Sequence, residues 1–193
     1  MSPAATIDDA AARAALLRSA DGVFYARGVG AVGMAEIRDD SGVSLRRLYT
    51  LYPSKRDLVA AWLTERHASW MAWFAGAVER IAATGVEPLL ASFDAVAEWA
   101  ATPGYRGCAF VNTAAESGEI DDVHRAIVAD HKQGLISYLE TLARDRGYRE
   151  PASLARMIAV LLDGAMAEAA VLSSGEPVAA ARAAAALVLE ASR

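Results

Sequence analysis

Apolar residues recur along this chain at intervals of three and four, the spacing that places side chains on one face of an α-helix. Leu16, Ala20, Val23 and Phe24 form one such stripe. Strand-like alternation is scarce, and glycine or proline separates the periodic stretches. Residues 1–7 lack the pattern, and we expect them to be disordered. We predict an all-α fold of about nine helices, over residues 8–27, 34–41, 45–51, 55–83, 87–101, 106–117, 123–146, 152–172 and 178–191.

The second and third predicted helices are short and meet at a glycine. Gly42 suits the left-handed backbone that ends a helix. Ser44 is a favourable N-cap for the next helix, and Pro53 ends that helix because the residue before a proline is disfavoured in the α region. Leu48 and Tyr52 are four residues apart and are predicted to face inward. Two short helices joined in this way are typical of a helix-turn-helix.

The outward face of the third helix is basic. Residues 44–56 contain four Lys or Arg and no Asp or Glu. A short basic helix after a glycine turn is what a helix-turn-helix presents to the major groove of DNA. The alternative is a solvated helix face that happens to be basic.

The residues at this turn resemble the DNA-binding domain of the TetR/AcrR-like family of transcriptional regulators. Three motifs carry the resemblance, which spans about residues 10–65: SGVS at 41–44, LYTLY at 48–52 and PSK at 53–55. It implies a helix-turn-helix domain over residues 1–54 and an effector-binding and dimerisation domain over residues 55–193. It also implies a homodimeric repressor that binds a palindromic operator in double-stranded DNA and is released by a small-molecule effector.

Four residues depart from the family pattern, among them Arg38, which stands where a small Ala is common. Gly33 stands where a Thr or Ser cap is usual, Ala35 where an Arg is frequent, and Leu51 where a His is frequent. These last three support an alternative function, an all-α small-molecule binding or sequestering protein with a weakened DNA-binding head.

We assign DNA contacts on and beside the third helix. Arg46 and Arg47 are predicted to reach bases or phosphates, and Leu45 a thymine methyl group. The remaining contacts are predicted to position the phosphates. The full predicted set is Ser44, Leu45, Arg46, Arg47, Tyr49, Thr50, Tyr52 and Lys55.

The net charge of −5 is distributed unevenly. Residues 1–60 contain eight Lys or Arg and seven Asp or Glu, whereas residues 61–193 contain eleven and seventeen. The N-terminal third therefore carries the surface suited to phosphates, and the rest is acidic.

Aromatic and polar residues of the middle helices are candidates for an effector site. The segment YRGCAFVNTAAE at 105–116 resembles the C-terminal domain of one TetR-like branch. Core packing accounts for most of these aromatic residues, and we predict that some of them instead line a pocket for a small apolar or aromatic effector. Its predicted residues are Trp70, Phe93, Trp99, Phe110, Asn112 and His131.

The sequence contains no convincing catalytic or metal-binding pattern. Asn112, Glu116 and His131 meet if the sixth and seventh helices touch, and a polar network or pocket lining is favoured over a metal site. Cys108 with His131 would imitate a thiol–base pair, but a buried structural cysteine is far commoner. We expect no enzymatic activity, no cofactor and no metal.

The last two predicted helices have more apolar surface than one core requires. Such a surplus suits a self-complementary two-fold interface, and a four-helix bundle with a second copy would cover it. Packing within the monomer is the alternative. The predicted interface residues are Leu161, Ala165, Ala169, Ala181, Ala185 and Val188.

The start of the chain lacks the charged and apolar regions of a signal peptide, and no apolar stretch approaches the length needed to cross a bilayer. With one cysteine, no intramolecular disulfide can form. We therefore expect a cytoplasmic protein without a membrane partner.

Overall fold

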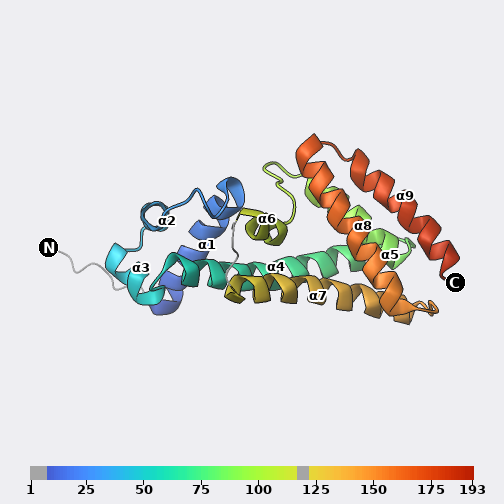
Figure 1. The fold of residues 1–193 in the computed structure, drawn as a ribbon, viewed down its shortest axis with the longest axis horizontal. Coiled ribbons are helices and arrows are strands. Elements are labelled where there is room, and N and C mark those ends of the chain that lie inside the picture. The colour runs from blue at the N-terminus through green and yellow to red at the C-terminus, as the bar shows by residue number, and fades with distance from the viewer. Residues whose placement is uncertain (1–7, 117–121) are drawn as a thin grey trace. The chain divides into compact units, whose positions relative to one another are not determined.

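The structure, a computed structural model, describes residues 8–116 and 122–193. Within these residues it confirms the all-α prediction with nine helices (Figure 1). The helices are α1 (Asp9–Arg27), α2 (Met34–Ser41), α3 (Leu45–Leu51), α4 (Lys55–Ala82), α5 (Pro88–Ala100), α6 (Ala109–Glu116), α7 (Asp122–Asp145), α8 (Pro151–Leu172) and α9 (Glu176–Ala191). The predicted disorder of residues 1–7 and most of the predicted turn at 118–122 lie outside the described residues.

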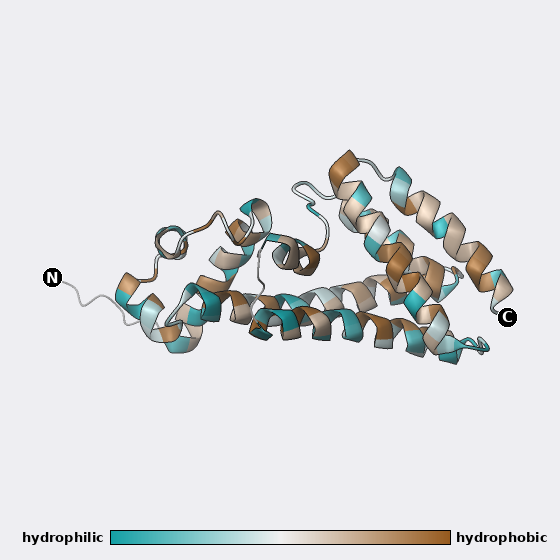
Figure 2. Ribbon diagram, viewed as in Figure 1, coloured by the Kyte–Doolittle hydropathy of each residue, from teal (hydrophilic) through white to brown (hydrophobic). Residues whose placement is uncertain are grey.

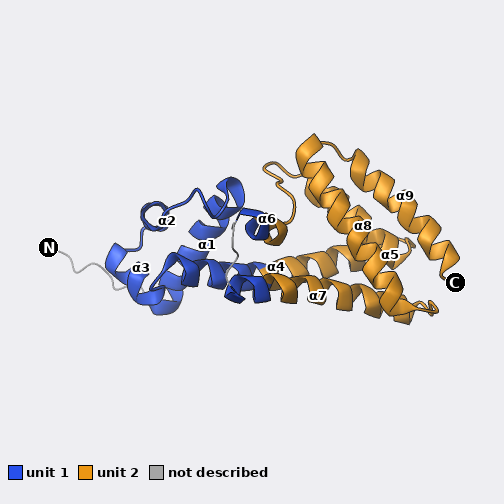
Figure 3. Cartoon of the chain, viewed as in Figure 1, with its two compact units in different colours: residues 1–66, 113–127 blue, residues 67–112, 128–193 orange. Residues whose placement is uncertain are grey.

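The chain forms two compact units (Figure 3). Unit 1 comprises residues 1–66 and 113–127, and unit 2 comprises residues 67–112 and 128–193. Three helices, α4, α6 and α7, therefore contribute residues to both units. The predicted domain boundary between residues 54 and 55 concerns function rather than packing, and it stays a prediction.

Unit 1 has a core built from one face of each of its helices. The α1 stripe supplies Leu16 and Phe24, and Leu48 comes from α3; all three are buried. The Phe24 ring meets the Trp62 ring of α4 edge to face, with centroids 5.2 Å apart. The indole N–H of Trp62 donates a hydrogen bond to Asp21 of α1 at 2.7 Å, which satisfies the polar atom of a buried side chain.

Local signals fix the turn between α2 and α3 as predicted. Gly42 has a φ of +68°, in the left-handed region, and its N–H donates to the carbonyl of Arg38. The Ser44 hydroxyl accepts a hydrogen bond from the N–H of Arg47 at 3.3 Å and so caps α3. Gly33 occupies the N-cap position of α2 without a side-chain cap.

In unit 2, α5, α8 and α9 pack against one another, and α4 and α7 contribute buried residues to the same core. Helix α8 packs against α9 and α5, and α5 packs against α9. Figure 2 shows hydrophobic residues along α8 and α9, and buried examples include Ile158 and Leu162. Arg182 of α9 donates two hydrogen bonds to the Asp94 carboxylate of α5, at 2.7 and 3.2 Å, and thereby links these two helices.

Helix α6 begins three residues later than the sequence predicted, at Ala109 rather than 106. Gly107 has a φ of +75°, and a Cβ there would lie 3.2 Å from the carbonyl oxygen of Met166. The Asn112 side chain donates to the carbonyl of Arg106 at 2.8 Å. These contacts hold residues 106–108 outside the helix, and the sequence signals them only through the glycine. Within the described residues, no helix combines the length and hydropathy that a membrane span requires.

Candidate nucleic-acid interface and effector site

Helix α3 has one buried and one exposed face. Leu48 and Leu51 are buried, whereas 40% of Leu45 and 46% of Tyr49 is exposed. Arg46 and Thr50 are also exposed. Burial of the inward leucines fixes the rotation of the helix in unit 1, so the outward residues form a continuous surface, which we call the α3 face.

The two arginines of α3 differ in their surroundings. Arg47 forms an ion pair with Asp9 of α1, and its side chain is 30% exposed. Arg46 has no ion pair among the residues that the structure describes. Of the two predicted base contacts, Arg46 is therefore the one whose guanidinium is available for a ligand.

The polar residues on and beside the α3 face differ in how accessible their side chains are for contact with DNA. The Thr50 hydroxyl donates to the carbonyl of Arg46 at 2.9 Å, and the Ser44 hydroxyl caps the helix. Lys55 is half-buried at the start of α4. Tyr52 is only 5% exposed, and the Arg13 guanidinium lies 5.3 Å from the centroid of its ring. Burial of Tyr52 confirms that it faces inward and argues against the phosphate contact predicted for it.

Two of the predicted effector residues lie in an aromatic cluster of unit 2. The centroids of Trp70 and Trp99 are 5.8 Å apart, and Trp70 also stacks on Phe74 at 4.8 Å. Trp99 meets Tyr105 edge to face at 4.9 Å. The indole nitrogen of Trp70 is buried and has no hydrogen-bond partner within the described part of the chain. An unsatisfied buried donor is costly, and a ligand acceptor would relieve that cost.

His131 and Phe110 form a second group beside this cluster. Their rings are stacked, with centroids 3.6 Å apart, and His131 is 2% exposed. The Trp70 ring meets the His131 ring edge to face at 5.3 Å. The Nδ1 atoms of His131 and His67 lie 3.1 Å apart, so one ring donates and the other accepts.

The sequence analysis missed His67. Its position three residues before Trp70 and seven before Phe74 places all three on one face of α4, and that spacing is visible in the sequence. The sequence analysis also missed Gly134 of α7, which lies next to His67. A Cβ at Gly134 would lie 3.1 Å from Cε1 of His67. The absent side chain leaves room for the imidazole ring.

Asn112 and Glu116, which were predicted to meet His131, each form a hydrogen bond with a different backbone group. Asn112 donates to the carbonyl of Arg106, and Glu116 accepts a hydrogen bond from the N–H of Gly30 at 3.0 Å. Within unit 2, the Asn112 side chain therefore makes no hydrogen bond to His131 among the described residues. Phe93 is fully buried and belongs to the hydrophobic core of unit 2.

Cys108 is buried next to a lysine. The ammonium nitrogen of Lys132 lies 3.6 Å from its sulfur and forms an ion pair with Asp163 at 2.6 Å. Among the described residues, no group of three or more His, Cys, Asp or Glu side chains is arranged to hold a metal ion.

Half of the residues predicted for a dimer interface are already covered in the monomer. Ala165, Ala169 and Ala185 are buried in the core of unit 2. The other three, Leu161, Ala181 and Val188, are partly buried and pack against the same core. The outward faces of α8 and α9 instead carry Val160, Val171 and Leu187, which are 71%, 82% and 69% exposed.

Two family models match this chain. Residues 16–62 match the model described as bacterial regulatory proteins, tetR family. Residues 85–185 match the model described as tetracyclin repressor-like, C-terminal domain.

Several solved structures resemble the chain over nearly its whole length. A TetR-family transcriptional regulator from Streptomyces coelicolor is 28% identical, with a TM-score of 0.80, and the alignment covers 94% of this chain and 95% of that one. A putative TetR transcriptional regulator from Streptomyces avermitilis is also 28% identical, with a TM-score of 0.73 and coverage of 90% and 97%. Reduced NemR from E. coli shares the fold at 22% identity, with a TM-score of 0.76 and coverage of 89% and 94%. No protein with a curated description matches the chain.

Proposed function

Because the chain belongs to the TetR family of bacterial transcriptional regulators, whose members bind DNA and are not enzymes, we propose that it binds a palindromic operator as a homodimer. Regulators of this family are typically repressors that an effector releases. The protein acts in this way on double-stranded DNA in the cytoplasm, and a small apolar or aromatic molecule releases it.

The α3 face is the surface that reads the operator. The observation that carries this assignment is the exposure of Arg46 and Tyr49 opposite the buried Leu48. Arg46 donates to a guanine, which is the commonest specific contact of arginine in the major groove. Leu45 contacts a thymine methyl group, and Tyr49 and Lys55 contact phosphates.

Operator binding by single variants tests this assignment. The probe is the DNA that flanks the gene of this protein, titrated in a gel-shift assay at several salt concentrations. We expect Arg46→Ala to cost about 1–3 kcal/mol and to relax sequence preference, and Lys55→Ala to weaken all sequences alike and to reduce the salt slope by about one. Arg149→Ala, an exposed arginine between α7 and α8, is the control. Wild-type binding by Arg46→Ala and Lys55→Ala would contradict the assignment.

The homodimer forms through the outward faces of α8 and α9. Three large apolar side chains are exposed to solvent in the monomer: Val160, Val171 and Leu187. Contact with a second copy would bury them. A two-fold axis would place the same patch of both copies together, as an isologous interface requires.

The effector site involves the aromatic cluster around Trp70 and Trp99, with His131 and Phe110 beside it. The unpartnered indole N–H of Trp70 supports this location, because an acceptor on the effector would complete its hydrogen bonding. Titration of a varied ligand panel by calorimetry, with operator release as the second measurement, tests the site. Trp70→Phe keeps an aromatic side chain, although a smaller one, and removes the N–H donor, so a true effector should lose affinity for this variant.

A second candidate function is small-molecule sequestration with a weakened DNA-binding head. The absence of a side-chain cap at Gly33 and the burial of Leu51 favour it. Failure of the protein to bind its own upstream DNA, combined with tight ligand binding, would favour sequestration over repression.

A further inference from the structure

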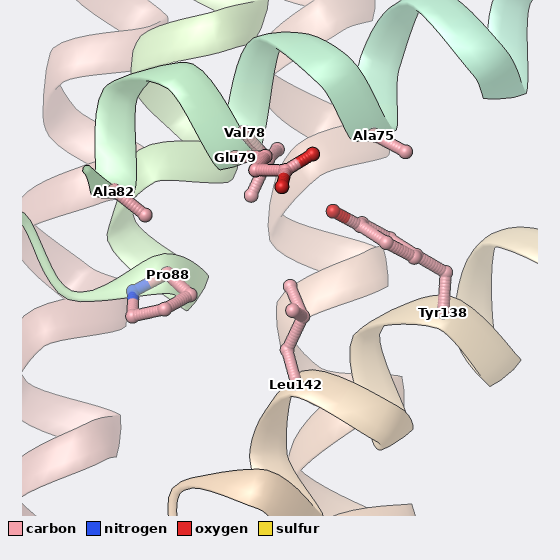
Figure 4. Close-up of a pocket in the computed structure, with 7 residues that line it drawn as sticks. All are labelled: Ala75, Val78, Glu79, Ala82, Pro88, Tyr138 and Leu142. Carbon is pink, nitrogen blue, oxygen red and sulfur yellow. The ribbon is translucent and has the colours of Figure 1, made fainter.

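Unit 2 contains a cavity beside the aromatic cluster, where the ring of its lining residue Tyr138 meets the ring of Phe74 edge to face with centroids 5.9 Å apart. It has a volume of about 350 Å³ and is lined by α4 from Ala75 to Ala82, by Pro88 of α5, and by Tyr138 and Leu142 of α7 (Figure 4). This volume lies at the lower end of the range of about 300–1,000 Å³ for small-molecule pockets. Its lining is almost entirely apolar and shares no residue with the proposed effector site.

Two polar groups interrupt the apolar lining. Glu79 of α4 is exposed, and within the described residues its carboxylate has neither an ion pair nor a hydrogen bond. The adjacent Arg80 is paired with Glu98 instead. Figure 4 shows the hydroxyl group of Tyr138 pointing toward the side where the Glu79 carboxylate lies.

The phenol of Tyr138 is also without a hydrogen-bond partner in the described part of the chain. Burial, and then the charge of Glu79, raise the pKa of Tyr138, so the phenol keeps its proton at neutral pH. The cavity therefore presents one negative charge and one neutral hydroxyl at the edge of an apolar space. A cation is favoured next to Glu79, and an anion is repelled.

We propose that this cavity binds a small organic ammonium compound, with its apolar body against Val78 and Leu142 and its ammonium group between the Glu79 carboxylate and the Tyr138 hydroxyl. The apolar body gains by leaving water, and the ammonium supplies the counter-ion that the carboxylate lacks. Neither operator binding nor the aromatic effector site is needed for this interaction, so it goes beyond the proposed function.

Three probes with the same ring test the charge requirement on the full chain. Cyclohexylammonium, cyclohexanol and cyclohexanecarboxylate are each titrated to millimolar concentration by ligand-observed NMR. We expect saturable binding that is tightest for the ammonium and weakest for the carboxylate. Glu79→Gln should weaken ammonium binding about fivefold, the upper end for an exposed ion pair, and leave cyclohexanol binding unchanged.

A control and a second variant complete the test. Glu65→Gln makes the same change at an exposed position of α4 fourteen residues earlier and should leave all binding unchanged. Leu142→Trp fills the cavity and should abolish binding of the ammonium, while circular dichroism verifies its helix content. Equal affinities for ammonium and alcohol, unchanged ammonium binding by Glu79→Gln, or no saturable binding would each overturn the proposal.

Discussion

Gly28 leaves space for the carboxylate of Glu116, the last residue of α6. Gly28 follows α1 with a φ of +87° and a ψ of 153°, and a Cβ at this position would overlap the carboxyl group. Two residues later, the N–H of Gly30 donates to the same carboxylate at 3.0 Å. Within unit 1, the end of α6 is therefore joined to the loop that leads into the helix-turn-helix.

We expect Gly28→Ala to destabilise the protein in two ways, through the backbone conformation of residue 28 and through the close approach of the Glu116 carboxylate. The backbone conformation is open almost only to glycine, at a cost of about 1–3 kcal/mol for other residues. The methyl group would in addition displace Glu116. Thermal or urea unfolding measures the loss.

A double variant separates the two causes. Gly28→Ala combined with Glu116→Ala removes the overlap but keeps the backbone strain, so stability should recover only in part. Gly76→Ala, in α4 with open space around the position, is the control and should stabilise by about 0.5–1 kcal/mol. Equal stability of Gly28→Ala and wild type would contradict the close approach.

Glu116→Ala alone should loosen the loop before α2. One exposed hydrogen bond is lost, with an expected cost of about 1 kcal/mol. Amide exchange at Gly30 should accelerate in the variant, whereas Glu168→Ala, at an exposed position of α8, should leave it unchanged. Unaltered exchange at Gly30 would show that the hydrogen bond does not protect this amide.

Gly33→Ser should stabilise α2. Gly33 has the extended backbone of a normal N-cap, with φ of −96° and ψ of 157°, and open space surrounds it. A serine hydroxyl could accept a hydrogen bond from the first turn, and the unfolded chain would lose flexibility. We expect a gain of about 0.5 kcal/mol in the free energy of unfolding. Gly33→Ala, which lacks the hydroxyl, should not reproduce it.

Glu87 should make the stability of unit 2 depend on pH. Burial raises its pKa above the usual 4.5, and hydrogen bonds from the N–H groups of Leu90 and Leu89 offset this only in part. The folded chain therefore holds this proton more tightly than the unfolded chain. Its stabilising contribution is fully present below pH 4.5 and is lost as the pH rises through the folded-state pKa.

Replacement by glutamine isolates this contribution. Glu87→Gln keeps an oxygen that can accept from Leu90 but carries no charge. The unfolding free energy of the variant, measured relative to wild type by urea titration, should increase from acid to neutral pH. A difference that stays constant over this range would refute the role of Glu87.

Leu187→Glu should dissociate the dimer without unfolding the monomer. The residue is 69% exposed in the monomer, so a charge there costs little until a second copy covers it. Light scattering should report a monomer with wild-type helix content and weaker operator binding. Ala129→Glu places the same charge on an exposed position of α7 and should remain dimeric.

Short-range signals made the helix-turn-helix predictable. The left-handed Gly42 and the Ser44 cap each depend on interactions within a few residues, so their sequence spacing was sufficient to place α2 and α3. Helix α6 was placed less well, because Gly107 is held by the backbone of α8 rather than by its own neighbours.

Contacts between distant residues were not encoded in any local pattern. Arg46 and Arg47 are adjacent in sequence, and the ion pair of Arg47 with Asp9 distinguishes them in the structure. His67 meets His131 across 64 residues. Helices α8 and α9 are apolar on more than one face, so periodicity alone could not choose between Ala165, which packing buried, and Val171, which it left in solvent.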